Sequence, residues 1–500
     1  MNPKYIIVQA GGKGTRLEHL TKNKPKALVP VDNLPMLFHL FRKYPQSNYI
    51  IIGDYCYNVL ERYLAAFAQV KYQLICATGY EGTCAGLSQA MALIPPKTPF
   101  LLIWSDLILP KDFSLPEGQG NYIGIAKDFP CRWKYEEGVF TKERSDTFGV
   151  AGLFYLEESA ALSDVPLEGE FVRWLSTKRY CFSTLPLYRV KEYGLLSEYN
   201  KLETARCRPF NRIGIDGDLF VKEPLDKQGE ELARREIAWY RYVEGKRFPN
   251  IPKVVSYHPL KMEYIQGRPI YECEGLSSKE KSSILRQIID CLKSLQGIAE
   301  APFEPESYQE AYVGKTFQRL KKVRQLVPFA EDRTVMINGR SCRNVFQYQK
   351  ELEQALREYA PATFRFIHGD CTFSNIMLRE DGTPVLIDPR GYFGHTELLG
   401  DPAYDWAKLY YSIVGNYDQF NRKHFDLTIG EKGVQLKIAS NGWEGLEDEF
   451  FGLLQGEVTP RQIKLLHAII WLSLTTYAWE NYDSICGAFY NGLYYLEEVL

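Results

Sequence analysis

The chain has 500 residues, and 45% of them are hydrophobic, which is enough for about three structural units with well-formed cores. Sixty basic and 62 acidic residues leave a formal charge of -2, and no long run of one sign suits a nucleic-acid backbone. Eleven scattered cysteines without a CxxC pair indicate reduced thiols, and no signal-like start or membrane-length apolar run is present. We therefore expect a cytoplasmic protein without nucleic-acid binding or membrane insertion.

The first 200 residues or so alternate short apolar runs with helical patterns. Strands are expected at 5–8, 49–52, 72–77 and 100–104, and helices at 36–43 and 58–68. This alternation predicts a Rossmann-like α/β domain over residues 1–205, with a mixed, mainly parallel sheet. Such sheets bind ligands beyond the carboxyl ends of their strands.

The pattern changes near residue 210. A hairpin at 211–215 and 219–222, a helix at 230–243 and strands at 254–257 and 260–265 predict a small β-rich lobe over about 206–268. Helices expected at 279–296, 308–327, 345–359 and 460–482 predict a helical large lobe over about 269–500. Residues 206–500 are thus expected to form an α+β, bilobal domain.

A glycine-rich turn follows the first expected strand. Its glycines, which would let backbone amides approach phosphate oxygens, are Gly11, Gly12 and Gly14. Arg16 and Lys26 supply positive charge, and Asp106 follows the strand at 100–104. The turn is neither a GxxxxGK[ST] P-loop nor a GxGxxG dinucleotide fingerprint, and by itself it could be an ordinary tight turn. With both cations and Asp106, it predicts a nucleoside triphosphate site.

A second constellation lies about 350 residues downstream. His368-Gly369-Asp370 follows an apolar strand pattern, Asn375 comes five residues after Asp370, and a further apolar run leads to Asp388. Phosphoryl transfer from ATP needs a carboxylate at the acceptor hydroxyl and oxygen ligands for Mg²⁺. Asp370 fits the first role, and Asn375 with Asp388 fits the second.

The first 200 residues resemble the sugar-nucleotidyltransferase family. The stretch GGKGTRLEHLTKNKPKALVPV, which begins at Gly11, follows the family signature GxGTRxxPxTxxxPKxLxPV, although His19 replaces a proline. The resemblance implies that Thr15 and the three glycines bind the triphosphate, and that Gly82 and Thr83 contact the base. It also implies that Arg16 and Lys26 are catalytic.

The same resemblance implies a metal-assisted transfer. Asp106 matches the metal-binding aspartate of the family, and Glu192, in Glu192-Tyr193-Gly194, stands where the family has the Asp of a later Asp-x-Gly. In the family, a phosphomonoester oxygen attacks the α-phosphorus of a nucleoside triphosphate, and pyrophosphate leaves. Mg²⁺ and cations would offset the repulsion between the two anionic reactants.

From about Phe210 the chain resembles the aminoglycoside phosphotransferase and choline kinase superfamily, which implies a protein-kinase-like fold. The resemblance assigns Lys222 to the ATP phosphates with Glu236 as its ion-pair partner. It places the adenine at a hinge that contains Glu263 and Ile265. The segment Ile387-Asp388-Pro389-Arg390-Gly391 replaces DFG, as in small-molecule kinases, and Asp405 is expected to order the catalytic loop.

Together these patterns predict a bifunctional enzyme with Mg²⁺ at both sites. ATP would phosphorylate a small hydroxylated metabolite (a sugar, alditol or polyol), and a second nucleotide, with CTP favoured, would convert the phosphomonoester into an NDP-linked precursor of cell-surface glycan such as capsule. One alternative is a choline or other amino-alcohol kinase, with an aromatic cage on the expected helix at 460–482; its aromatic residues are Trp471, Tyr477, Trp479 and Tyr482. Others are a non-catalytic nucleotide sensor and an antibiotic-resistance kinase. The acceptor, the base and the oligomeric state stay open.

Overall fold

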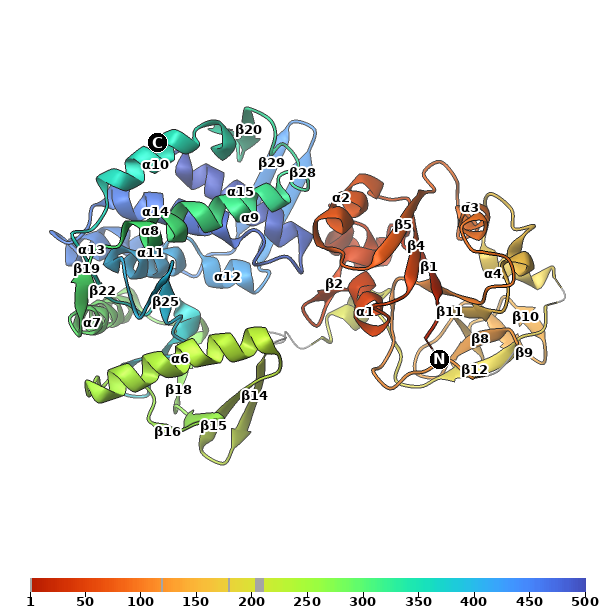
Figure 1. Cartoon of the computed structure of the whole chain (residues 1–500), viewed down its shortest axis with the longest axis horizontal. Helices are drawn as coiled ribbons and strands as arrows, with labels where there is room; N and C mark the ends of the chain where they lie inside the picture. Colours follow the sequence, from red (N-terminus) through yellow and green to blue (C-terminus); the bar gives the residue numbers. More distant parts are fainter. Residues whose placement is uncertain (1, 118–119, 179, 203–210) are drawn as a thin grey trace. The chain divides into compact units, whose positions relative to one another are not determined.

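The computed structural model of the chain describes residues 2–117, 120–178, 180–202 and 211–500. The chain divides into two compact units, one formed by the residues before this last gap and one by most of those after it (Figure 1). The expected boundary at residue 205 lies outside the described residues. Within the described ranges, no helix is both long and apolar enough to cross a bilayer.

A mixed sheet forms the centre of the first unit, as predicted. Its parallel strands lie in the order β5 (Lys71–Cys76), β4 (Asn48–Gly53), β1 (Tyr5–Gln9) and β6 (Phe100–Trp104). The antiparallel strand β11 (Gly149–Leu156) joins β6 and also pairs with β8 (Tyr122–Ala126) and β9 (Lys134–Glu136); β12 (Ser183–Leu187) extends β8, and β10 (Val139–Thr141) extends β9. The interior strands are buried on both faces, so they are continuous apolar runs rather than alternating ones.

Short helices and strand pairs complete this unit. The helices are α1 (Met36–Lys43), α2 (Tyr57–Phe67), α3 (Leu87–Ala92), α4 (Phe171–Ser176) and α5 (Leu196–Tyr199), with 3-10 turns at Thr15–Thr21, Lys26–Leu28 and Ser159–Leu162. The small pairs are β2 (Pro30–Val31) with β3 (Leu34–Pro35), and β7 (Leu107–Ile108) with β13 (Lys191–Glu192). The structure confirms the expected bounds of α1 and β6 and shifts those of α2, β4 and β5 by one residue at each end.

The small lobe of the second unit is an antiparallel sheet covered by one helix (Figure 1). Its order is β14 (Asn211–Asp216), β15 (Leu219–Pro224), β17 (Leu260–Glu263) and β16 (Val254–Tyr257). Helix α6 (Lys227–Gly245) packs against β15, and the Asp226 side chain caps it by accepting a hydrogen bond from Gly229 N at 2.8 Å. This confirms the predicted hairpin and helix.

The large lobe combines short sheets with helices. The sheets nearest the second constellation are β18 (Gly267–Pro269), β23 (Ile376–Arg379) and β24 (Pro384–Leu386), and β19 (Glu300–Pro302), β22 (Thr363–Phe366) and β27 (Leu399–Gly400), beside the pair β25 (Tyr392–Phe393) and β26 (Thr396–Glu397). The helices are α7 (Ser278–Gln296), α8 (Pro305–Gln309), α9 (Lys315–Val323), α10 (Gln349–Glu358), α11 (Pro402–Ile413), α12 (Tyr417–Asn421), α13 (Glu447–Leu453), α14 (Pro460–Leu474) and α15 (Tyr482–Leu496), with 3-10 turns at Ile270–Glu272, Val345–Gln347, Phe373–Asn375 and Glu444–Leu446.

Three expectations for this lobe are wrong. A four-stranded sheet, ordered β21 (Arg340–Arg343), β20 (Thr334–Ile337), β29 (Gly433–Ile438) and β28 (Phe425–Gly430), occupies a region expected to be mainly helical. The helix expected at 308–327 is broken by a π-helical turn at Glu310–Gly314 and ends at Val323. The helix expected at 460–482 ends at Leu474, where Thr475 Oγ1 donates to Leu472 O and satisfies a carbonyl of the last turn.

The last correction also affects the proposed aromatic cage. Trp471 on α14 is fully buried, and its Nε1 donates to His467 Nε2 at 2.9 Å, whereas Tyr477 lies beyond the end of the helix. The expected single helix carrying all four aromatic residues is therefore absent. Trp471 is a core residue.

Candidate active sites

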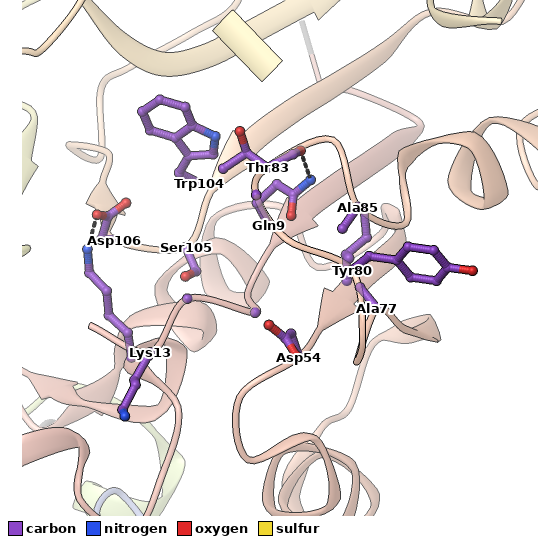
Figure 2. Close-up of a pocket in the computed structure, with 15 residues that line it drawn as sticks. Gln9, Lys13, Asp54, Ala77, Tyr80, Thr83, Ala85, Trp104, Ser105 and Asp106 are labelled. Atoms are coloured by element: carbon purple, nitrogen blue, oxygen red, sulfur yellow. Dashed lines mark hydrogen bonds and ion pairs between the residues drawn. The ribbon is translucent and has the colours of Figure 1, made fainter. Parts of the chain in front are cut away.

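A pocket of about 330 Å³ opens at the carboxyl ends of the parallel strands of the first unit (Figure 2). Of the site residues expected from the sequence, it is lined by Gly11, Gly12, Lys26, Gly82, Thr83 and Asp106. Further lining residues are Gln9, Lys13, Ile52, Asp54, Ala77, Tyr80, Ala85, Trp104 and Ser105. Figure 2 shows Asp106 and Tyr80 at opposite ends of the labelled set.

The three glycines of the turn are needed for different reasons. A Cβ at Gly11 would lie 2.8 Å from Asp54 Cβ, and Gly14 has φ 63° and leads into the 3-10 turn that begins at Thr15. Gly12 has nothing within 4 Å of an added Cβ. The space in front of Gly12 is thus left open on the pocket side, where a phosphate could approach its backbone.

Gly12→Ala tests this difference between folding and binding. Because an alanine Cβ meets no protein atom there, we expect an unchanged melting temperature and at least a tenfold higher KM for the nucleoside triphosphate in pyrophosphate release. Gly11→Ala serves as the contrasting variant, because its Cβ would collide with Asp54 and lower the melting temperature. An unchanged KM in Gly12→Ala would show that no phosphate packs against this residue.

The loop that carries Gly82 and Thr83 is fixed by two other segments, the end of β1 and residues 169–171. Gln9 Nε2, at the end of β1, donates to Thr83 O at 2.7 Å (Figure 2). Thr83 Oγ1 accepts from Phe171 N, at the start of α4, at 2.8 Å. Gly82 has φ 89°, and a Cβ there would lie 2.4 Å from Gly169 O. The loop is therefore held in one conformation before any base arrives.

Lys26, Asp106 and Glu192 form a charged cluster next to Arg16. Lys26 Nζ forms an ion pair with Asp106, and Glu192 Oε1 lies 3.9 Å from Lys26 Nζ and 4.0 Å from Arg16 Nη2. The pairing of β7 with β13 brings Glu192 beside Asp106. An added Cβ at Gly194 would collide with Glu192 Oε1, so the glycine makes room for the longer carboxylate. The structure thus brings together the four side chains expected at the reacting phosphates.

The electrostatics of this cluster suit a divalent cation. Burial and the neighbouring Asp106 raise the pKa of Glu192 to about 7, whereas Lys26 outweighs burial and lowers the pKa of Asp106. Two carboxylates together with substrate phosphates are a common ligand set for Mg²⁺. No group of three or more His, Cys, Asp or Glu side chains in the described part of the chain could hold a metal by itself. The residues therefore fit Mg²⁺ that is bound jointly with a nucleotide.

In the second unit, the segment that contains Asp370 is tied to its surroundings by His368 and Asp405. Asp405 Oδ2 and Oδ1 accept from His368 N at 2.9 Å and Gly369 N at 2.7 Å, as expected for a residue that orders this loop. His368 is fully buried, and burial lowers its pKa to about 4. The neutral ring therefore donates from Nε2 to Ile387 O at 3.0 Å, while Nδ1 accepts from Asp370 N at 3.2 Å.

Asp370 is held as an ionised group by two side chains. Asn375 Nδ2 donates to Asp370 O at 2.8 Å and to Asp370 Oδ2 at 3.1 Å, and Lys408 Nζ on α11 lies 2.8 Å from Asp370 Oδ1. Burial disfavours the carboxylate, but Lys408 outweighs this effect and lowers the pKa of Asp370 to about 2. Lys408 is absent from the expectations, because nothing in the sequence near Asp370 points to a residue on α11.

Lys222, Glu236 and Asp388 form the nucleotide side of this site. Lys222 Nζ on β15 lies 2.7 Å from Glu236 Oε2 on α6, so the predicted ion pair is present, and 2.5 Å from Asp388 Oδ1. Burial raises the pKa of Glu236 to about 7, even though Lys222 opposes the shift. Ile387 N donates to Asn375 O at 3.0 Å and so keeps Asp388 next to Asn375. The Asp388 carboxylate and the remaining amide oxygen of Asn375 fit the Mg²⁺ that accompanies ATP phosphates.

The expected adenine hinge lies at the end of β17. Glu263 Oε1 pairs with Arg379 Nη1 at 2.6 Å, and its Oε2 accepts from Lys253 N at 3.1 Å, whereas Ile265 is buried. The Glu263 carboxylate is thus engaged in holding the hinge to β23. Adenine contact by the backbone of this segment stays a prediction.

Comparison with known proteins identifies the classes to which the two units belong. Residues 5–115 match the family described as "Nucleotidyl transferase", and residues 210–427 match the "Phosphotransferase enzyme family". The chain is therefore a fusion of a nucleotidyl transferase domain with a phosphotransferase domain.

Individual curated relatives match part of the chain. The chain is 25% identical to the bifunctional protein GlmU of Methanococcus vannielii over 167 residues. This match covers 33% of this chain and 36% of that protein. It is 28% identical to the glucose-1-phosphate thymidylyltransferase of Streptomyces griseus over 127 residues. This match covers 24% of this chain and 32% of that protein. The chain thus spans about a third of the length of these curated relatives.

Among solved structures, the inositol-1-phosphate CTP transferase from T. maritima has 14% sequence identity and a TM-score of 0.34, and the match covers 40% of this chain and 93% of that chain.

Proposed function

We propose that this chain is a bifunctional enzyme that catalyses two consecutive reactions. Its kinase unit phosphorylates a small hydroxylated metabolite with ATP, and its nucleotidyltransferase unit then couples the phosphomonoester to a nucleotide. The main support is that one chain carries both the Asp370–Asn375–Lys408 arrangement and the Lys26–Asp106–Glu192 cluster. The product of the first reaction has the chemistry that the second requires.

In the kinase reaction, Asp370 orients the acceptor hydroxyl toward the γ-phosphorus. Lys222 binds the ATP phosphates, with Glu236 fixing its position, and Asn375 and Asp388 would hold Mg²⁺, which would neutralise phosphate charge. A carboxylate whose pKa is about 2 is a weak base in the ground state. It therefore acts mainly by orientation, and it accepts the hydroxyl proton late, as the new O–P bond forms.

In the transfer reaction, the phosphomonoester oxygen attacks the α-phosphorus and displaces pyrophosphate. Arg16 faces the leaving pyrophosphate, and Lys26 offsets charge on the reacting phosphates. Mg²⁺ held by Asp106 and Glu192 would supply the remaining positive charge. Gly82 and Thr83 hold the base.

We favour a sugar, alditol or polyol as the acceptor, CTP as the second nucleotide and the cytoplasm as the location. The NDP-linked product would serve cell-surface glycan synthesis, such as that of capsule. This choice follows from the resemblance of the two units to families that supply such precursors. A choline or amino-alcohol kinase is the alternative.

The test is a panel of acceptors incubated with ATP, Mg²⁺ and each nucleoside triphosphate, with NDP-linked products detected by mass. We expect one acceptor to yield a product in an ATP-dependent manner, with CTP as the preferred nucleotide. Adding the matching phosphomonoester should remove the need for ATP. If product still requires ATP when the phosphomonoester is supplied, the two reactions are not consecutive.

A further inference from the structure

Four cationic side chains of the large lobe lie close enough to act on one another electrostatically. Lys315 and Arg319 lie one turn apart on α9, Arg390 follows Asp388 by two residues, and Lys408 lies on α11. Burial lowers the pKa of Lys315 well below its usual value, and Arg390, Arg319 and Lys408 lower it further. The four side chains therefore share one electrostatic environment.

Asp370 and Glu310 offset only part of this positive charge. In the described ranges, Lys408 pairs with Asp370, but Lys315, Arg319 and Arg390 form no ion pair within 4 Å. Arg390 instead donates to Tyr404 Oη at 2.9 Å and Tyr392 Oη at 3.1 Å. These contacts are neutral hydrogen bonds, and the carboxylate that acts on the charge of Arg390 is Asp370, which already pairs with Lys408.

Among the described residues, Arg319 and Lys315 also lack an ion pair with a carboxylate. Arg319 Nη1 donates to Ser473 O at 2.6 Å and Ser473 Oγ at 3.1 Å. Glu310 is the carboxylate that raises the pKa of Lys315, and it does not offset the lowering by burial and the three cations. Its side chain lies against Gly314, where an added Cβ would meet Glu310 Oε2 at 2.1 Å.

The pKa of Tyr392 indicates that the electrostatic potential around it is positive. Burial by itself would raise the pKa of this phenol, yet Arg390, Arg235 and Arg319 together lower it below its usual value. The Arg235 guanidinium also lies 4.3 Å from the centre of the Tyr392 ring. A partly buried tyrosine with a lowered pKa indicates a positive surrounding.

This arrangement is unfavourable for the protein alone. Like charges at positions i and i+4 of a helix repel, and partly buried cations without an ion pair bear a desolvation cost. A π-helical turn at Glu310–Gly314 leads directly into α9, and such turns are frequent at functional sites. A bound anion would offset both the repulsion and the desolvation.

The positions of these cations favour the acceptor side of the site over the nucleotide side. Lys222, the cation expected at the ATP phosphates, comes from β15 of the small lobe and contacts Glu236 and Asp388. The four cations all come from the large lobe, and Lys408 contacts Asp370, the residue that faces the acceptor hydroxyl.

We propose that the hydroxylated acceptor of the kinase unit also carries an anionic group, a carboxylate or a phosphate, which binds between Lys315, Arg319 and Arg390. This inference rests on the proposed kinase function and narrows its substrate class. The acceptor oxygen forms a bond to the γ-phosphorus as the bond to the β-phosphate oxygen breaks; ADP leaves, and the hydroxyl proton passes through Asp370 to solvent. A quaternary ammonium compound such as choline would face three cations that form no ion pair within the described ranges, so the amino-alcohol alternative is disfavoured.

Matched acceptors that differ in charge test the inference on the full chain. Glycerol, glycerate, glycerol 3-phosphate and choline, and glucose with gluconate and glucose 6-phosphate, are compared by Asp370-dependent ADP release. We expect kcat/KM to be at least tenfold higher for an anionic member than for its neutral or cationic counterparts, and the better anion distinguishes carboxylate from phosphate. A preference for glycerol, glucose or choline would overturn the inference and leave the kinase function standing.

Variants on α9 identify the residues concerned. Lys315→Met and Arg319→Met should each raise the KM for the anionic acceptor at least tenfold without changing the KM for ATP, and Lys315→Arg should restore much of the loss. Lys321→Met removes an exposed lysine from the same helix and should change neither KM. Melting temperatures show whether each variant is folded. Equal KM values in folded Lys315→Met and Lys321→Met would overturn the assignment.

A calorimetric titration makes the test independent of the true acceptor. Inorganic phosphate is titrated into the full chain saturated with a non-hydrolysable ATP analogue, Mg²⁺ and CTP, so that both nucleotide sites are filled. We expect binding that weakens at least tenfold in Lys315→Met but not in Lys321→Met; equal binding in both would overturn the anion site. If this difference is found but no compound of any charge supports Asp370-dependent ADP release, the proposed kinase function fails and the anion site stands.

Discussion

Asp370→Asn is expected to lower ATP-dependent phosphorylation by about a thousandfold or more, the scale of losing an oriented general base and its charge. The asparagine keeps the shape of the side chain but leaves Lys408 without its carboxylate at 2.8 Å and offers no proton acceptor to the hydroxyl. ADP release with a saturating acceptor measures the loss. Nucleotidyl transfer to a supplied phosphomonoester should continue at the rate of the unmodified chain.

Asp381→Asn is the matched control for this variant. Asp381 is an exposed carboxylate between β23 and β24, and it accepts a hydrogen bond from Thr383 N at 2.9 Å. The same chemical change there should leave both activities intact. Phosphorylation by Asp370→Asn within tenfold of the control would remove Asp370 from the catalytic role.

Asp106→Asn is expected to produce the opposite separation of activities. Removing this carboxylate leaves Lys26 without its closest partner and Mg²⁺ with only one protein carboxylate, so nucleotidyl transfer should fall by about a thousandfold or more. Pyrophosphate release from CTP with a supplied phosphomonoester measures the loss. ADP release by the kinase unit should be unchanged.

Asp112→Asn provides the control in the first unit, because Asp112 is an exposed partner of Arg189 on the surface. It should keep both activities. If Asp106→Asn instead transferred nucleotides as well as Asp112→Asn, the Lys26–Asp106–Glu192 cluster would not be the transfer site.

Local sequence patterns predicted those site residues that directly follow a strand. The glycine turn follows β1, Asp106 follows β6, and Asp370 follows β22, so the order of residues along the chain determines where these groups emerge. The Lys222–Glu236 ion pair and the role of Asp405 also followed from motif positions, and the structure shows both contacts. The catalytic roles assigned to these side chains stay predictions.

Contacts made by tertiary packing could not be predicted in this way. Lys408 reaches Asp370 from a helix 38 positions further on, and Gln9 reaches Thr83 across 74 positions. Likewise, β20 pairs with β29 almost a hundred residues away, and apolar content by itself did not distinguish these strands from the surrounding helices. The end of α14 at Leu474, where Thr475 Oγ1 donates to Leu472 O, was also not apparent from the sequence.

The fixed loop around Thr83 limits how the nucleotide preference of this chain could be engineered. Gly169 O accepts from Cys84 N at 2.9 Å, and Gly169 N donates to Glu81 O at 2.7 Å, so both flanks of the loop are fastened to a segment almost ninety residues away. A loop transplanted from an enzyme with another base preference would lack the partner residues for these hydrogen bonds. An exchange of specificity therefore has to move residues 81–84 and 169–171 together as one module.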